Sequence, residues 1–248
     1  STPALLVAPT GSGKTEAGLL WAAQQAEMTT PPPPRLFYVL PYQASMNAMH
    51  DRLSRRHFPA GQVGLQHGRS LSKLYLDLQG GASLDAETAA AQAHDREDLT
   101  TLGVPPVRVL SPYQLLKGIY ALKGYEMRLI DMAGGLFIFD EIHAYEPARL
   151  ALIISLMGWL AQHLGCRFLV MTATLPPTVQ QALEEALPEC AVIRATPNVF
   201  ARSQRHTVHL LEGELSMPEM LDRIAQEVAA GCSPLVCANT VGRAMMLY

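Results

Sequence analysis

A short glycine-rich segment near the amino terminus constrains the fold more than any other part of this sequence. The apolar run Ala4–Ala8 is followed by Pro9-Thr10-Gly11-Ser12-Gly13-Lys14-Thr15 and then by a helix-length stretch, Thr15–Met28. Glycines let backbone N–H groups turn inward around phosphate oxygens, and the helix that follows directs its first N–H groups at the same anion. A strand, this loop and a helix in that order predict a phosphate-binding loop rather than an ordinary glycine turn.

The side chains of the loop predict which phosphate compound it binds. Lys14 supplies a point charge suited to the β- and γ-phosphates of a nucleoside triphosphate, and the hydroxyl of Thr15 is a suitable ligand for Mg²⁺. The motif begins with Ala8 where the strict pattern has glycine. We therefore expect a nucleoside triphosphate site.

Apolar runs of strand length alternate with helix-length stretches along most of the chain. Near-continuous apolar strands separated by helices are typical of a parallel sheet covered on both faces, so the predicted fold class is α/β. The predicted strands are Ala4–Ala8, Leu36–Leu40, Val63–Gln66, Val107–Leu110, Leu136–Phe139, Phe168–Met171, Ala191–Ile193, Val208–Leu211 and Leu235–Cys237. The predicted helices are Thr15–Met28, Gln43–Arg56, Pro112–Leu122, Ala148–Leu164, Pro177–Ala186 and Pro218–Ala230.

Two acids follow the strand Leu136–Phe139 directly. The carboxyl ends of parallel strands are where α/β sheets bind ligands, so Asp140 is placed to hold Mg²⁺ beside Thr15. Glu141 can orient and deprotonate an attacking water. A solvated strand end or helix cap is the alternative, and the upstream phosphate loop makes it the weaker one.

A possible relay follows the acids. His143 can hydrogen-bond to the hydroxyls of Thr172 and Thr174, which come after the strand Phe168–Met171. Such a link would connect the nucleotide state to the position of a neighbouring domain. A capping or turn role for the two threonines is the other interpretation.

Taken together, these motifs resemble motifs I, II and III of the superfamily-two DExH/DEAD-box helicases. More narrowly, the chain resembles the CRISPR-associated helicase–nuclease of type I systems, from Leu5 to Arg243. The matching segments are Ala8–Thr15, Asp140-Glu141-Ile142-His143-Ala144-Tyr145, Thr172-Ala173-Thr174-Leu175-Pro176, Gly13-Lys14-Thr15-Glu16-Ala17, His67-Gly68-Arg69-Ser70, Ser111-Pro112-Tyr113-Gln114-Leu115-Leu116 and Asn239-Thr240-Val241-Gly242-Arg243-Ala244.

The resemblance implies two RecA-like domains that close on ATP and translocate along single-stranded DNA. It places a RecA-like domain at 1–196, a linker at 197–205 and the beginning of a second RecA-like domain at 206–248. It also implies recruitment by a CRISPR surveillance complex and an HD nuclease outside this chain. By motif position, the residues that would hold ATP and Mg²⁺ are Thr10, Gly11, Ser12, Gly13, Lys14, Thr15, Glu16 and Asp140. The residues that would take part in catalysis are Lys14, Asp140, Glu141 and His143. The residues that would contact DNA are Pro41, Tyr42, Gln43, Ser111 and Gln114.

The chain departs from the family pattern because the segments called motifs V and VI are missing, and with them a phosphoryl-stabilising arginine. We therefore expect it to bind ATP but to hydrolyse it poorly by itself. Two other functions stay open: a general DExH helicase or restriction-type translocase, and a nucleotide-gated nucleic-acid-binding module.

Composition and charge narrow the function classes further. Only 17% of the residues are charged and the net charge is −3. The chain as a whole therefore lacks the positive charge that would indicate a nucleic-acid-binding protein. Residues 35–80 are nevertheless basic and residues 81–100 are acidic. The longest uncharged stretch is too short in its apolar part to span a bilayer, and we expect a cytoplasmic protein.

Cysteine and histidine patterns predict no metal site. The four cysteines lack metal-site spacing and are expected to be reduced thiols in the core. His50-Asp51 and His94-Asp95 stand without further ligands, and a His206-x₂-His209 pair would point to opposite faces of a strand. For residues 71–101 the sequence predicts only a possible helix near 84–99, capped by Ser83.

Overall fold

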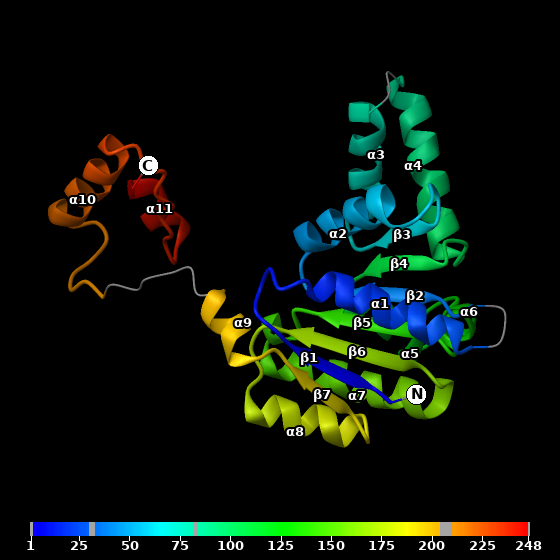
Figure 1. Cartoon of the computed structure of the whole chain (residues 1–248). Coiled ribbons are helices and arrows are strands. Elements are labelled where there is room, and N and C mark those ends of the chain that lie inside the picture. Colours follow the sequence, from blue (N-terminus) through cyan, green and yellow to red (C-terminus); the bar gives the residue numbers. More distant parts are fainter. Residues whose placement is uncertain (1, 30–32, 82–83, 204–209, 248) are drawn as a thin grey trace. The chain divides into compact units, whose positions relative to one another are not determined.

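A computed structural model describes residues 2–29, 33–81, 84–203 and 210–247 of the chain (Figure 1). The chain divides into two compact units, residues 1–204 and residues 205–248. Among the described residues, the strands all lie in the first unit and two helices lie in the second.

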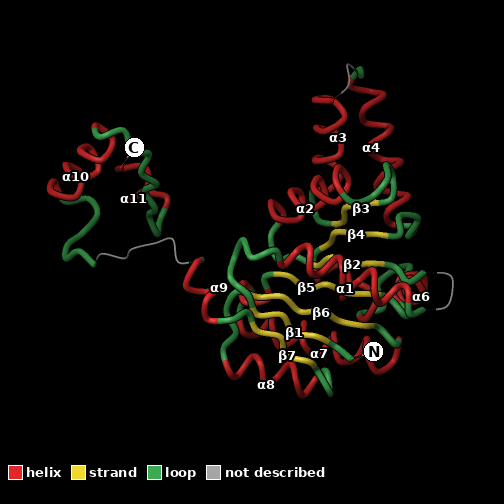
Figure 2. The backbone as a smooth tube through the Cα atoms, in the orientation of Figure 1, coloured by secondary structure: helices red, strands yellow, loops and turns green. Residues whose placement is uncertain are grey.

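The first unit is built on a central sheet, whose strands are yellow and whose surrounding helices are red in Figure 2. The sheet has seven strands, and every strand pair is parallel. This confirms the predicted α/β class. The strand order is β3-β4-β2-β5-β6-β1-β7. The strands are β1 (Ala4–Val7), β2 (Leu36–Val39), β3 (Val63–Gln66), β4 (Val107–Leu110), β5 (Leu136–Asp140), β6 (Arg167–Thr172) and β7 (Ala191–Arg194).

Helices cover both faces of this sheet, as the near-continuous apolar strands require. One face packs against α1 and α2, and the other against α5 to α8. The helices of the first unit are α1 (Lys14–Glu27), α2 (Gln43–Arg56), α3 (Ser70–Gly81), α4 (Ala86–Thr101), α5 (Pro112–Ile119), α6 (Tyr125–Met132), the 3₁₀ turn η1 (Ile142–Ala144), α7 (Pro147–Leu164), α8 (Pro177–Ala186) and α9 (Pro197–Arg202).

A row of side chains in register fixes the centre of the sheet. Phe37 on β2 pairs with Phe137 on β5, which neighbours Phe168 on β6. The ring centroids of successive phenylalanines lie 4.5 Å and 5.2 Å apart. At the other end of the row, the guanidinium of Arg108 on β4 lies 4.5 Å from the Phe37 centroid and pairs with Asp131. The phenylalanine rings stabilise one another by stacking, and the face of Phe37 also attracts the guanidinium of Arg108.

Helices α3 and α4 form a hairpin beside β3, in the region where the sequence predicted only one possible helix (Figure 1). The two helices share a small core of Leu74, Leu78, Ala89 and Ala93. Helix α4 begins after Asp85, whose side chain accepts a hydrogen bond from the N–H of Thr88 at 2.8 Å. Asp85 is therefore the cap, and the predicted cap, Ser83, lies outside the described residues.

The second unit contains α10 (Pro218–Ala229) and α11 (Val241–Leu247). The predicted strand 235–237 is irregular, and the prediction was wrong there. A parallel strand needs a neighbour for its backbone N–H and C=O groups, and the described residues of this unit contain no strand. The predicted strand 208–211 and the His206/His209 pair lie partly or wholly outside the described residues. That this unit begins a second RecA-like domain stays a prediction, as do the boundaries 196 and 206.

The cysteines do not all lie in the core as the sequence predicted. Cys166 is buried and Cys190 is half-buried, but Cys232 and Cys237 are exposed in the second unit. In the part of the chain that the structure describes, no helix has the length and apolar character needed to cross a membrane.

We expect the four thiols to react with iodoacetamide at very different rates. Burial raises the pKa of Cys166 to about 12 and that of Cys190 to about 11, and the thiolate is the reactive form. At pH 8, Cys232 and Cys237 should be alkylated first and Cys166 last, by mass spectrometry of timed samples. Alkylation of Cys166 should accelerate as the pH rises toward 12. Equal rates at all four cysteines in the folded chain would contradict this burial pattern.

Candidate functional site: a nucleotide-binding edge of the sheet

The phosphate loop connects β1 to α1 and carries its glycines where the backbone needs them. Gly11 and Gly13 have φ values of 81° and 88°, in the left-handed region that side chains rarely adopt. A Cβ atom added to Gly13 would meet no atom within 4 Å, so the conformation and not the available space demands glycine. Residues 10–13 are exposed, and within them the N–H of Ser12 donates to the carbonyl of Pro9 at 3.3 Å, which closes the turn that a phosphate would meet.

Lys14 begins α1 and folds back over this loop. Its ammonium donates hydrogen bonds to the carbonyl oxygens of Ala8 at 3.0 Å and Pro9 at 3.1 Å, and the residue is buried. These carbonyls hold the ammonium in place at the loop. Phosphate oxygens are stronger acceptors for a cation than neutral carbonyls, so the residue is ready to exchange partners.

Asp140 ends β5 on the same edge of the sheet. Its Oδ2 accepts a hydrogen bond from the hydroxyl of Tyr38 at 2.8 Å, and its Oδ1 accepts one from the N–H of Glu141 at 3.0 Å. Burial raises the pKa of this carboxyl, and the negative charge of Glu141 adds to the effect. The hydrogen bond from Tyr38 acts in the opposite direction by stabilising the carboxylate.

Tyr38 positions one of the two residues that the sequence predicts as Mg²⁺ ligands. Its phenol donates a hydrogen bond to Asp140 at 2.8 Å, and its side chain is fully buried. Burial, together with the adjacent Asp140 carboxylate, raises the pKa of the phenol. A hydroxyl and a carboxylate are the hard oxygen donors that Mg²⁺ prefers, with water completing its shell, so the residues present fit this ion.

Glu141 adopts a left-handed backbone conformation with φ of 59°. For a residue with a side chain this costs about 1–2 kcal/mol. Its Oε2 lies 3.2 Å from Nε2 of His143. Strain of this kind persists only where the surrounding structure enforces it, and such positions concentrate at functional sites.

The predicted contact between His143 and the threonines is present. Nδ1 of His143 lies 2.8 Å from the hydroxyl oxygen of Thr172, which donates its own proton to the carbonyl of Thr174 at 2.6 Å. Because the hydroxyl proton is committed, the imidazole Nδ1 is the donor to Thr172. The side chain of Thr174 takes no part, and the coupling role of this contact stays a prediction.

Arg52, on α2, is a contact that sequence reasoning missed. Its guanidinium lies 3.4 Å from the hydroxyl of Thr15 and forms an ion pair with Glu16. The pKa of Glu16 is lowered, first by a backbone hydrogen bond and further by Arg52. Arg52 and Asp140 both line a cavity of about 430 Å³, which Glu141 also borders. Nothing in the sequence distinguishes Arg52 from its helix neighbours Arg55 and Arg56. Tyr38 has the sequence pattern of an ordinary core residue in a strand.

The predicted DNA-contacting residues follow β2 and β4, which are neighbours in the sheet. Tyr42 and Gln43 are exposed, whereas Pro41 and Gln114 are half-buried. Ser111 is buried, with 7% of its surface exposed. The accessible part of this set is therefore centred on Tyr42 and Gln43.

The histidine–aspartate pairs do not form a metal centre in the described residues, where no group of three or more His, Cys, Asp or Glu could hold an ion. Asp51 instead accepts hydrogen bonds from Lys73 at 3.3 Å and contacts His50 at 3.4 Å. His94-Asp95 lies within helix α4.

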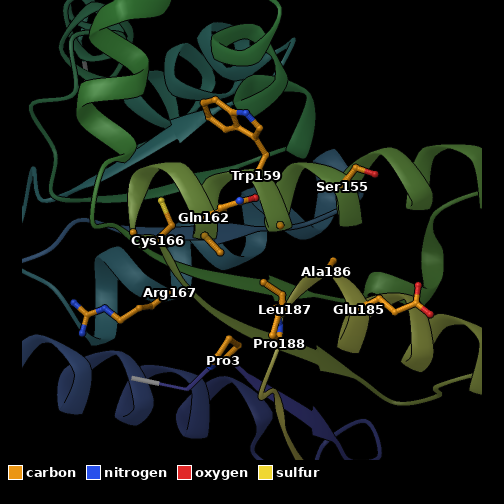
Figure 3. A pocket seen from close by; sticks show the side chains of 13 residues that line it. Pro3, Ser155, Trp159, Gln162, Cys166, Arg167, Glu185, Ala186, Leu187 and Pro188 are labelled. Atoms are coloured by element: carbon orange, nitrogen blue, oxygen red, sulfur yellow. The ribbon is translucent and has the colours of Figure 1, made fainter.

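A larger cavity of about 1000 Å³ lies between α7, the end of α8 and the start of β6 (Figure 3). Its wall includes Pro3, Trp159, Cys166 and Arg167. These residues belong to the amino-terminal edge of the strands, opposite the phosphate loop, and none of the predicted site residues lines it. Size alone therefore does not locate the functional site in this fold.

Comparison with known proteins gives consistent results. The profile of the DEAD/DEAH box helicase family matches residues 2–182. The "CRISPR-associated endonuclease/helicase Cas3" of Thermus thermophilus is 30% identical, over 100% of this chain and 30% of that protein. The "CRISPR-associated nuclease/helicase Cas3" of Methanothermobacter thermautotrophicus is 28% identical, over 98% of this chain and 29% of its own length.

A solved structure of Cas3 from T. fusca with ADP is also similar. It is 26% identical, has a TM-score of 0.57, and the match covers 76% of this chain and 20% of that one. The T. fusca Cas3–ATP structure matches with a TM-score of 0.56, over 75% of this chain and 21% of that one, at 26% identity. The chain thus spans about a third or less of the length of the relatives it matches.

We expect Tyr38→Phe to lower the free energy of unfolding by about 1–3 kcal/mol at pH 7, because it leaves a buried carboxylate oxygen without its donor. The folded-state pKa of Asp140 is raised, so the carboxyl loses its charge on acidification sooner than an ordinary aspartate. The loss should therefore be smaller at pH 4 than at pH 7. Urea unfolding at both pH values measures it, with Tyr120→Phe, an exposed phenol, as the control. An equal loss at both pH values would show that the phenol does not act on the charged form of Asp140.

Proposed function

The chain belongs to the DEAD/DEAH box helicase family, and from this premise we propose that it is the ATP-binding motor domain of a CRISPR-associated helicase that acts on single-stranded DNA. One observation carries the proposal most directly. Arg52 contacts Thr15 of the phosphate loop and lines the same cavity as Asp140 and Glu141 of the acidic strand end, where the phenol of Tyr38 holds Asp140. A phosphate loop and a pair of acids at one edge of the sheet support hydrolysis of a nucleoside triphosphate.

In the proposed mechanism the loop amides of residues 10–13 bind the phosphates, and Lys14 exchanges its carbonyl partners for the β- and γ-phosphate oxygens. Thr15 and Asp140 would hold Mg²⁺, which neutralises charge on those oxygens. Glu141 orients the attacking water and accepts its proton. His143, bonded to Thr172, holds the loop after β6 against the acidic strand end.

The nucleic acid is proposed to lie along the carboxyl edge of the sheet, over Pro41, Tyr42, Gln43 and Gln114, with Ser111 behind them.

By analogy with the relatives, a CRISPR surveillance complex would recruit the protein and an HD nuclease outside this chain would cut the DNA. Residues 1–196 would form RecA-like domain one, and 206–248 the beginning of domain two after a linker. A cytoplasmic location belongs to the same proposal, since reduced thiols and ATP are found there.

We further propose that the 248-residue chain alone binds ATP but turns it over slowly. In this proposal the arginine that stabilises the transferring phosphoryl group lies in sequence outside the chain. Such an arginine contributes about 10³–10⁵ in rate in related nucleoside triphosphatases.

We expect wild type and Glu141→Gln to bind a fluorescent ATP analogue with similar affinity, and both to show little ATPase activity, with or without single-stranded DNA. Glutamine keeps the shape of Glu141, so ATP binding should be preserved. It cannot accept the proton of the attacking water, so the variant should lose even the slow hydrolysis that wild type retains. Lys14→Ala should abolish binding and serves as the control for site-specific fluorescence.

Other outcomes would select other functions. Strong DNA-stimulated turnover that Glu141→Gln abolishes would mean that the chain holds a complete hydrolytic site. DNA affinity that changes with a non-hydrolysable analogue, without turnover, would favour a nucleotide-gated binding module. Failure to associate with a CRISPR surveillance complex would leave a general DExH helicase.

A further inference from the structure

Arg108 is a charged residue in a buried strand. Only 4% of its surface is exposed, and the other residues of β4 are valine and leucine. Its guanidinium covers the ring of Phe37 and forms an ion pair with Asp131, whereas its Nε is buried without a hydrogen-bond partner among the described residues. A buried arginine is costly unless its charge and its donors are satisfied. The contacts that the structure describes therefore satisfy Arg108 only in part.

The acid that pairs with Arg108 is shared with a second arginine. Oδ1 of Asp131 lies 2.8 Å from Nε of Arg35, and Oδ2 of the same carboxylate pairs with Arg108. Burial lowers the pKa of Arg108, and the Asp131 carboxylate acts in the opposite direction. The positive charges of Arg35 and Arg128 lower this pKa further. Positive charge thus exceeds negative charge around Asp131.

A cavity of about 190 Å³ opens at this cluster, between the end of α4, the start of β4 and the first turn of α6. Arg108 and Asp131 line it, and so do Lys123 and Arg128. Lys123 is exposed and Arg128 is half-buried. Neither of them forms an ion pair with a described residue, and the rest of the chain contains no aspartate or glutamate. Both cations are thus available to an anion in the cavity.

Helix α6 begins at the same cavity. Gly124 is its N-cap, lines the cavity and has a φ of 77°, and no side chain caps the helix there. A Cβ atom added to Gly124 would meet no atom within 4 Å, so the space beside the N-cap is open. The first N–H groups of a helix lack intrahelical acceptors and carry partial positive charge, so they too are donors for an anion.

Charge and size indicate which anion fits. A phosphate monoester carries about −1.5 to −2 at pH 7, and its oxygens accept hydrogen bonds from guanidinium, ammonium and helix N–H groups together. The cavity volume of about 190 Å³ exceeds the ~30 Å³ that one water occupies and lies below the roughly 300 Å³ at which pockets for larger ligands begin. Four cations and two acids leave an excess of two positive charges here: Arg35, Arg108, Lys123 and Arg128 against Glu126 and Asp131.

We propose that Arg108, Lys123, Arg128 and the first turn of α6 bind a small phosphate anion, either inorganic phosphate or a phosphate monoester. The site lies near the amino ends of β2, β4 and β5, because Arg35, Arg108 and Asp131 come at or shortly before the starts of these strands. The phosphate loop follows the carboxyl end of β1, at the opposite edge of the sheet. The inference therefore goes beyond the proposed function, and the two sites share no residue.

The test titrates the ¹⁵N-labelled full chain with inorganic phosphate at constant ionic strength and pH 7.5, and follows backbone amide resonances. The amides of Gly124 and Tyr125 should shift and saturate, and so should the Nε–H resonance of Arg108. The amides of Gly11 and Gly13 report separately on phosphate at the nucleotide loop. A second titration with glycerol phosphate distinguishes the two sources: saturation by both ligands includes monoesters, and saturation by inorganic phosphate alone restricts the site to the free ion.

Lys123→Ala and Arg128→Ala should each weaken phosphate binding at α6 by about 10- to 100-fold, because each removes a charged donor. Arg55→Ala removes an exposed cation of α2 with the same change in net charge, and should leave this affinity unchanged. Lys14→Ala should abolish the response of the phosphate loop and preserve the response at Gly124. Thermal unfolding of each variant verifies that the fold is retained.

The possible results separate this inference from the proposed function. Phosphate that shifts only the loop amides would overturn the α6 site and leave the proposed nucleotide site intact. Shifts at Gly124 that grow linearly without saturation would also overturn it, as would wild-type affinity in both Lys123→Ala and Arg128→Ala, since the arginines would then form a structural ion-pair cluster only. Saturation at Gly124 in a chain whose loop does not respond to an ATP analogue would support the α6 site and count against the proposed function.

Discussion

The parallel direction of all seven strands is the constraint on which the rest of the structure depends. A parallel strand can be joined to the next only by a crossover, so each strand is followed by a loop on one edge of the sheet and a helix on one of its faces. The phosphate loop after β1, the two acids at the end of β5 and the threonines at the end of β6 therefore share one edge. The pairing of β2 with β5 then brings Tyr38 and Asp140, 102 positions apart in the sequence, into hydrogen-bonding distance.

Within that edge, polar groups are shared between neighbouring strands. Tyr38 reaches from β2 to Asp140 at the end of β5, and His143 reaches from η1 to Thr172 at the end of β6. Each of these bonds satisfies a group that burial would otherwise penalise. The same bonds connect the acidic strand end to β2 and to the loop after β6. Interactions that stabilise the fold and interactions that organise the site are consequently the same ones.

Helix α2 connects the phosphate loop to the residues that follow β2. Arg52 connects α2 to Thr15 and Glu16, while Tyr42 stands at the beginning of the same helix. A single rigid helix thus contacts the nucleotide loop near its end and presents an aromatic ring at its start. If nucleotide and nucleic acid change each other's affinity, the thermodynamic coupling must be reciprocal, and α2 is a physical connection between the two.

The sequence by itself determined the α/β class, the seven strands of the first unit to within a residue or two, and the nucleotide motif, because apolar runs and glycine spacing are local signals. It also anticipated the contact of His143 with Thr172, since both follow parallel strands.

It did not find Tyr38 or Arg52, because a buried tyrosine in a strand and an arginine in a helix look the same whether or not they touch a site. It missed the hairpin partner α3 and placed a strand at 235–237 that the structure lacks. Those features depend on which segment packs against which, and only the tertiary structure decides that: α3 is held by α4, while residues 235–237 have no strand beside them in the described part of their unit.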